Sequence, residues 1–119
     1  MRVFILALIL FTAGLSSAAL AHSHITKTEP ADGEVLGASP ESIKITFGEP
    51  VRPKESFIHV LDKDGNQLNS DVLIPSLNEK ALIAPLPELE FGEYTVDWKA
   101  VCLCADHGVT EGTFKFTLK

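Results

Sequence analysis

Residues 94–101 read YTVDWKAV, a stretch in which apolar and polar side chains alternate. Successive side chains of a β-strand point to opposite faces, so this alternation predicts a strand with one buried face. Residues 112–118, GTFKFTL, alternate in the same way. The two stretches therefore predict the last two strands of a sheet.

Shorter stretches of the same kind predict strands nearer the N-terminus, at residues 25–28, 43–47, 57–61 and 81–85. Gly and Pro separate these stretches, and no segment after residue 22 has the periodicity of a long helix. The pattern predicts about seven short strands in one small domain. We therefore expect an all-β fold, an antiparallel sandwich or small barrel with an Ig-like plan.

The first 21 residues, MRVFILALILFTAGLSSAALA, predict a secretory signal peptide. One positive charge, Arg2, precedes an apolar stretch, and small residues lead to an ALA motif at 19–21 that suits signal peptidase. The apolar stretch is too short for a good transmembrane helix. We therefore expect cleavage of residues 1–21, no membrane insertion of the mature chain, and a single mature domain, residues 22–119, that starts at His22.

The predicted mature chain is acidic, with nine Lys and Arg against 16 Asp and Glu and a formal net charge of −7. Nucleic acids and anionic membranes attract clustered basic residues, so neither is an expected partner. The chain shows no nucleophile elbow and no phosphate-binding Gly-rich loop. His59 lies in the middle of a predicted strand and is expected to be structural or half-exposed. We expect a small binding protein and not an enzyme.

The predicted mature N-terminus, His22-Ser23-His24, offers two copper-binding geometries. The amine and imidazole of His22 can chelate a metal as a bidentate clamp that ligands from elsewhere complete. In the second geometry, the amine, two deprotonated backbone amides and the His24 imidazole form a square-planar site. Both suit Cu(II), which favours tetragonal nitrogen and oxygen donors. The alternative without a metal is a frayed terminus that contains histidines.

Residues 102–107, CLCADH, place two thiols, a carboxylate and an imidazole in one predicted loop. Asp106 and His107 are suitable ligands for Cu(II) or Zn(II), whereas thiolates favour Cu(I) or Zn(II). Side chains at i and i+2 of an extended strand share a face, so Cys102 and Cys104 could both bind one metal. The alternatives are a solvated polar loop with Cys102 buried, and cysteines that stay reduced or form intermolecular bridges. A disulfide between the two cysteines is less favoured because its ring is very small.

Together these features resemble the CopC family of periplasmic copper-binding proteins, known as copper resistance proteins. The resemblance spans nearly the whole predicted mature chain. It begins with a predicted signal that ends before a His. It continues in residues 22–24 (HSH), 29–33 (EPADG), 43–47 (IKITF), 49–51 (EPV), 85–87 (PLP), 92–98 (GEYTVDW) and 112–116 (GTFKF).

The resemblance implies a seven-stranded Greek-key β-barrel or sandwich of cupredoxin-like plan that binds copper without catalysing a reaction. In the family, Cu(II) is held by the amine and imidazole of the N-terminal His and by an Asp-x-His pair before the last strand. His22 matches the first element. Asp106 and His107 are the expected further ligands, with His24 as the alternative. Asp106 and His107 are adjacent in this sequence, and Gly108 occupies the position of the His in the family's Asp-x-His pair.

The resemblance also implies a periplasmic protein that carries or buffers copper, with an inner-membrane copper transporter of the CopD type as a partner. The methionine-rich Cu(I) site of some members has no counterpart, because Met1 is the only methionine. Cys102 and Cys104 are candidates for a Cu(I) site in its place. The competing interpretation is an exported Ig-like interaction module whose metal site is lost or reassigned to the cysteines, with Cu(I) or Zn as the ion.

Overall fold

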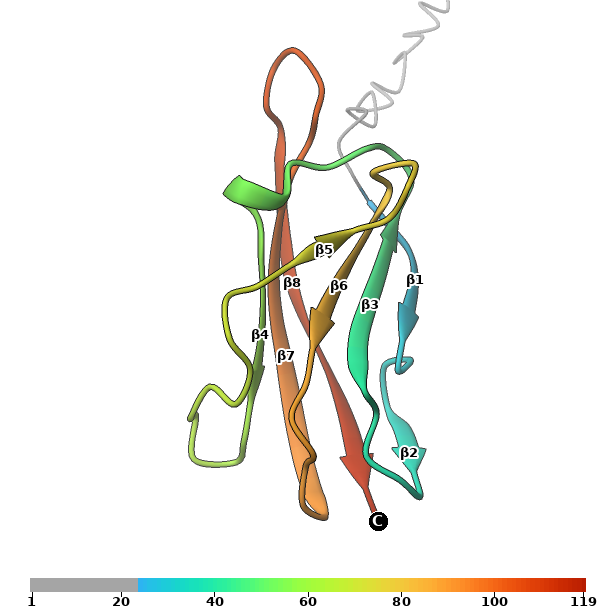
Figure 1. Ribbon diagram of the computed structural model, residues 1–119, viewed down its shortest axis with the longest axis vertical. Helices are drawn as coiled ribbons and strands as arrows, with labels where there is room; N and C mark the ends of the chain where they lie inside the picture. The colour runs from blue at the N-terminus through green and yellow to red at the C-terminus, as the bar shows by residue number, and fades with distance from the viewer. Residues whose placement is uncertain (1–23) are drawn as a thin grey trace, which may run out of the picture.

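The computed structural model describes residues 24–119, which form a sandwich of two four-stranded sheets (Figure 1). One sheet has the strand order β1-β3-β6-β5 and the other β2-β8-β7-β4. The strands are β1 (Ile25–Glu29), β2 (Glu34–Leu36), β3 (Ser42–Phe47), β4 (Phe57–Leu61), β5 (Ile74–Pro75), β6 (Ala81–Pro85), β7 (Gly92–Val101) and β8 (Val109–Leu118). A short 3-10 helix, η1 (Pro53–Glu55), precedes β4. The expected all-β, Ig-like fold is confirmed.

The hairpin of β7 and β8 contains the two stretches with the clearest alternation, and its strands pair in antiparallel register over ten residues each. In β7 the buried positions alternate as the sequence predicts. The rings of Phe47 and Trp98 meet across the two sheets with centroids 5.7 Å apart. Trp98 also covers Gly112, its cross-strand partner in β8, where a Cβ would lie 3.1 Å from the indole. A larger residue at position 112 would therefore crowd the indole and require it to shift.

Two short strands depart from the expected set of seven antiparallel strands. β2 pairs with β8 in parallel register, and β5 pairs with β6 over only two residues. None of the side chains in these two strands is buried. Because backbone pairing and not side-chain burial defines them, no period-two apolar pattern marks them in the sequence.

The predicted signal peptide, residues 1–21, lies outside the described residues, and so does His22. Between residues 24 and 119, no helix has the length and apolar character needed to cross a membrane.

Residues 48–52, here called the crossing segment, pass from one sheet to the other at one end of the sandwich (Figure 1). The segment forms backbone hydrogen bonds with three other parts of the chain. These bonds join Gly48 N to His24 O (2.9 Å), Val51 N to Glu79 O (2.9 Å), Arg52 N to Val101 O (2.8 Å) and Leu103 N to Pro50 O (2.9 Å). The start of the described chain, the β5–β6 turn and the β7–β8 loop are therefore tied together at this end.

A buried asparagine completes the edge of β4, the outermost strand of its sheet. Asn69 is 6% exposed, and its Oδ1 accepts a hydrogen bond from Val60 N at 2.8 Å. Its Nδ2 donates to Ile58 O at 2.7 Å. The side-chain amide thus supplies the donor and acceptor that a neighbouring strand would otherwise provide.

Replacing Asn69 with Ala leaves both backbone groups of β4 without these partners. We expect Asn69→Ala to lower the free energy of unfolding by about 2 kcal/mol, measured by urea denaturation. Asn66→Ala is the matched control, because the Asn66 side chain is exposed and makes one long hydrogen bond of 3.3 Å. Equal stabilities for the two variants would contradict this role of Asn69.

Candidate metal centre

His24 begins the described chain at the end of the sandwich where the crossing segment lies. Its carbonyl accepts the Gly48 N–H at 2.9 Å, and its exposed imidazole lies over Gly48. A Cβ at position 48 would come within 2.6 Å of the ring atom Cε1. The absence of a side chain at Gly48 therefore makes room for the His24 ring. Figure 1 shows that the β7–β8 loop lies at this same end.

The β7–β8 loop, residues 102–108, is a compact turn. Cys102 N donates to Gly108 O at 2.8 Å, and His107 N donates to Cys104 O at 3.2 Å. These two bonds close the loop on itself and fix the backbone that carries the predicted ligands.

Cys102 and Cys104 are joined by a disulfide in this loop. The expectation that this disulfide is less favoured than the alternatives was wrong. Their Cα atoms are 5.1 Å apart. Two residues of an extended strand span about 6.6 Å, so the chain has already turned here, and the extended geometry assumed for the pair does not hold. Cys102 is 1% exposed. Because a cysteine binds a metal as its thiolate, the cysteine site predicted for Cu(I) or Zn(II) requires reduction of this bond.

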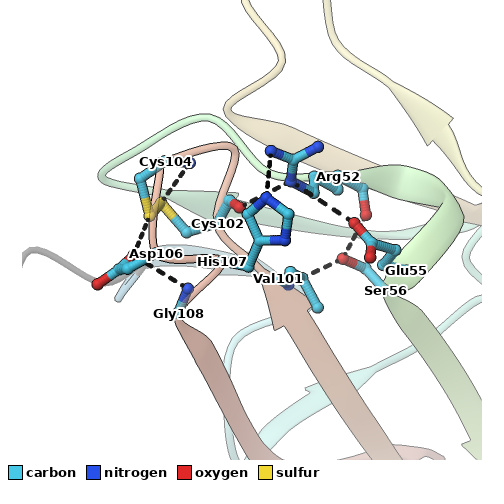
Figure 2. Close-up of polar contacts among 9 residues, drawn as sticks. All are labelled: Arg52, Glu55, Ser56, Val101, Cys102, Cys104, Asp106, His107 and Gly108. Atoms are coloured by element: carbon cyan, nitrogen blue, oxygen red, sulfur yellow. Dashed lines mark hydrogen bonds and ion pairs between the residues drawn. A yellow bond between two sulfur atoms is a disulfide. The ribbon is translucent and has the colours of Figure 1, made fainter.

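Asp106 lies at the exposed tip of the loop. Its Oδ1 accepts a hydrogen bond from Gly108 N at 3.2 Å, which forms an Asp-initiated turn. The same oxygen lies 2.9 Å from Cys104 Sγ (Figure 2). The carboxylate therefore borders the disulfide and not the imidazole of the next residue.

His107 has a φ of 51°, in the left-handed region that His adopts more readily than most residues. Its imidazole points toward Arg52, whose Nη2 lies 3.0 Å from His107 Nε2 (Figure 2). Arg52 Nε also donates to Cys102 O at 3.1 Å and lies 3.5 Å from Glu55 Oε2. A guanidinium has only donors, so His107 Nε2 is the acceptor and the proton of the neutral ring is on Nδ1.

The predicted ligands share one end of the sandwich but do not converge on one point. Asp106 and His107 are neighbours in sequence, yet their side chains point in different directions (Figure 2). Within residues 24–119, no three His, Cys, Asp or Glu side chains form a group that could hold a metal. The imidazole and carboxylate donors suit Cu(II). A complete site would need a further ligand, and the predicted one, His22, lies outside the described residues.

His59 and Arg52 are two further residues with side-chain contacts near or beyond the loop. His59 stacks on Phe57 with ring centroids 4.3 Å apart, and its Nε2 lies 3.4 Å from Asp71 Oδ1. Its half-buried position on β4 confirms the structural interpretation. Arg52 was not identified from the sequence, because it lies 55 positions from His107. The backbone pairing of Val51 with Cys102 brings Arg52 close to His107. No local sequence pattern predicts that pairing.

Comparisons with known proteins identify the family to which this chain is similar. The model of the CopC domain family matches residues 25–119. Protein YobA of Escherichia coli K12 is 31% identical over 93% of this chain and 90% of its own length. The copper transport protein CutJ of Bacillus subtilis is 28% identical over 93% of this chain, which corresponds to 20% of that longer protein.

Solved structures of two similar proteins share the fold. The crystal structure of CopC from Methylosinus trichosporium OB3b has a TM-score of 0.76 and 28% identity, over 82% of this chain and 94% of that one. The crystal structure of PcoC, a methionine-rich copper resistance protein from Escherichia coli, has a TM-score of 0.70 and 27% identity. The region of similarity covers 83% of this chain and all of PcoC. The family match and these likenesses extend over nearly the whole described chain, which therefore belongs to the CopC family.

Proposed function

We propose that this protein is an exported copper carrier or buffer that binds Cu(II) at its processed N-terminus and catalyses no reaction. The amine and imidazole of His22 form the primary clamp after cleavage of residues 1–21. Asp106 and His107 from the β7–β8 loop complete the coordination, and His24 is the alternative ligand. The periplasm is the compartment in which this protein works.

The observation that carries the proposal is the position of His24 at the end of the sandwich that bears the β7–β8 loop. His24 is bonded to Gly48, and Leu103 is bonded to Pro50. Gly48 and Pro50 are two residues apart, a span of at most about 7 Å. His22 precedes His24 by the same number of residues, so it has a reach of the same order. This spacing supports the proposal that the N-terminal clamp and the loop ligands bind one ion.

A copper transporter in the inner membrane, of the CopD type, is the partner that we propose. Support comes from CutJ, in which a segment similar to this chain occupies 20% of a longer copper transport protein. A chain that corresponds to one part of a transport protein is suited to deliver its ion to the rest of such a machinery. Delivery requires that copper be released, so the site must combine affinity with exchange.

The cysteine pair supports a second candidate, a Cu(I) site that forms after reduction. Cys104 Sγ is 2.9 Å from Asp106 Oδ1, so the two sulfurs lie beside a predicted Cu(II) ligand. A dithiol reductant would convert the disulfide into two thiols and be oxidised to its own disulfide. The resulting thiolates favour Cu(I), whereas the oxidised loop offers oxygen and nitrogen donors that favour Cu(II).

Replacing His22 with Ala removes the imidazole of the clamp and leaves the free amine. We expect His22→Ala to weaken Cu(II) binding by roughly tenfold or more, or about 1.4 kcal/mol, in a titration against a competing chelator. His59→Ala is the control, because its ring is half-buried on β4 and stacks on Phe57. An affinity unchanged by His22→Ala would remove the N-terminal clamp from the proposal.

Gly48→Ala tests whether His24 binds the ion from its observed position. The added Cβ would lie 2.6 Å from the imidazole, which must turn away because it is the end of a flexible side chain. If His22 is the primary ligand, we expect the Cu(II) affinity to change by less than about twofold. Gly37→Ala is the matched control, because nothing lies within 4 Å of a Cβ there. Loss of tight binding in Gly48→Ala alone would assign the site to His24 instead.

Reduction of the Cys102–Cys104 disulfide distinguishes the proposed Cu(I) site from the proposed Cu(II) site. We expect the purified protein to show no reactive thiol when unfolded without reductant and both thiols after reduction. Only the reduced form should withhold Cu(I) from a Cu(I)-specific chelator, because thiolates are soft ligands. The Cys102→Ser, Cys104→Ser double variant is the control. If that variant or the oxidised protein holds Cu(I) equally well, the cysteines are not the ligands.

A further inference from the structure

Arg52 is fixed in front of His107 by contacts of both its backbone and its side chain. Its N–H donates to Val101 O at 2.8 Å, and its own carbonyl accepts the Ser56 hydroxyl at 2.6 Å. The Ser56 hydroxyl oxygen in turn accepts a hydrogen bond from Val101 N at 3.0 Å. Val101, at the end of β7, therefore bonds to both Arg52 and Ser56. The guanidinium therefore emerges from a rigid base, and 30% of the side chain is exposed.

The guanidinium spans from the backbone of the loop to the ring of the predicted ligand. Nε donates to the carbonyl of Cys102 at 3.1 Å, and Nη2 donates to His107 Nε2 at 3.0 Å (Figure 2). Arginine is always charged and cannot accept a hydrogen bond. The bond to His107 is thus made to the lone pair of the neutral imidazole.

That lone pair is the one that a metal ion needs. In this tautomer Nδ1 carries the proton, so Nε2 is the only ring nitrogen able to bind an ion. Ions such as Zn(II) bind imidazole nitrogen at about 2 Å, so the metal and a guanidinium nitrogen at 3.0 Å cannot both face Nε2. If the proton moved to Nε2 to free Nδ1, two N–H donors would face each other at the same distance. In either case Arg52 must leave before His107 can ligate.

We propose that Arg52 is a displaceable competitor for copper at His107, a latch that keeps this ligand out of the coordination sphere until the ion arrives. This inference rests on the proposed function and names a residue that regulates it. Arg52 weakens copper binding through the lone pair that it occupies and through repulsion between its positive charge and the ion. It also favours release, because the guanidinium returns to His107 as copper leaves.

Glu55 gives the displaced guanidinium a second place to bind. Its Oε2 already lies 3.5 Å from Arg52 Nε, and the two residues are held on η1 and its cap. A carboxylate on this side compensates the arginine charge after the move. The guanidinium therefore contacts both His107 and Glu55 in this structure, and the Glu55 contact can persist after Arg52 leaves His107.

Arg52→Met tests the latch, because methionine fills similar space without a charge or a donor. We expect Arg52→Met to bind Cu(II) about five- to tenfold more tightly than the wild type in a chelator competition at fixed salt. Arg52→Lys, which keeps the charge but loses the planar fork, should lie between the two. Arg52→Gln, whose amide still bonds to the Cys102 carbonyl, replaces Arg52→Met if thermal unfolding shows that the latter is not folded.

The gain must depend on His107. In a His107→Ala background, Arg52→Met should change the copper affinity by less than about twofold, because the competed lone pair is absent. In copper-free protein at about pH 8, the nitrogen-15 shifts should show the Nδ1–H tautomer of His107 in the wild type and a mixture in Arg52→Met.

The outcomes distinguish the latch from the function on which it rests. Unchanged or weaker copper binding by Arg52→Met, or an equal gain in the His107→Ala background, would overturn the latch while the wild type still binds copper. If neither the wild type nor Arg52→Met binds copper, the proposed function itself fails and the latch fails with it.

Discussion

The backbone bonds of the crossing segment are the constraint on which the candidate metal centre depends. Residues 48–52 run over the open end of the sandwich and bond to His24 on one side and to Leu103 on the other. Pro50, which lacks an N–H, keeps this stretch from continuing as a regular strand, and Pro53 begins η1. The β7–β8 hairpin and the pairing of β1 with β3 already place the loop and the start of the described chain at this end, and the bonds of the crossing segment tie the two together.

Much of the fold could be predicted from alternation alone. β3, β4 and β7 bury every second side chain, and their positions in the sequence are close to those in the structure. β2 and β5 could not be predicted in this way because none of their side chains is buried. Their existence depends on backbone pairing with strands distant in the sequence, such as the parallel pairing of Glu34 with Phe116.

The candidate site was predictable by residue type but not by geometry. The sequence predicts that Asp106 and His107 lie in one loop and are suitable metal ligands, and the structure shows that both lie in an exposed loop. Adjacent residues do not share a direction, however, and here His107 has a left-handed backbone that turns its ring toward Arg52. The disulfide escaped prediction because the chain turns between Cys102 and Cys104. Arg52 escaped because a contact over 55 positions leaves no local signal.

The proposed copper site is better suited to exchange of the ion than to its storage. The loop ligands are exposed, the described residues contain no complete cage, and a cation occupies the imidazole that the ion would use. A carrier needs such a site, because a ligand set that is complete and rigid before the ion arrives would bind it tightly and release it slowly. In the proposed site, the N-terminal clamp would provide the initial affinity, and the loop would determine how firmly the ion is held.

The proposed copper site depends above all on the free amine of His22. The most direct test is the electron paramagnetic resonance spectrum of one equivalent of Cu(II) added to protein whose mass shows that it begins at His22. We expect a single tetragonal, nitrogen-rich Cu(II) signal, and we expect its loss when one extra residue precedes His22. The same signal in the extended protein, or weak heterogeneous binding in both, would contradict this expectation.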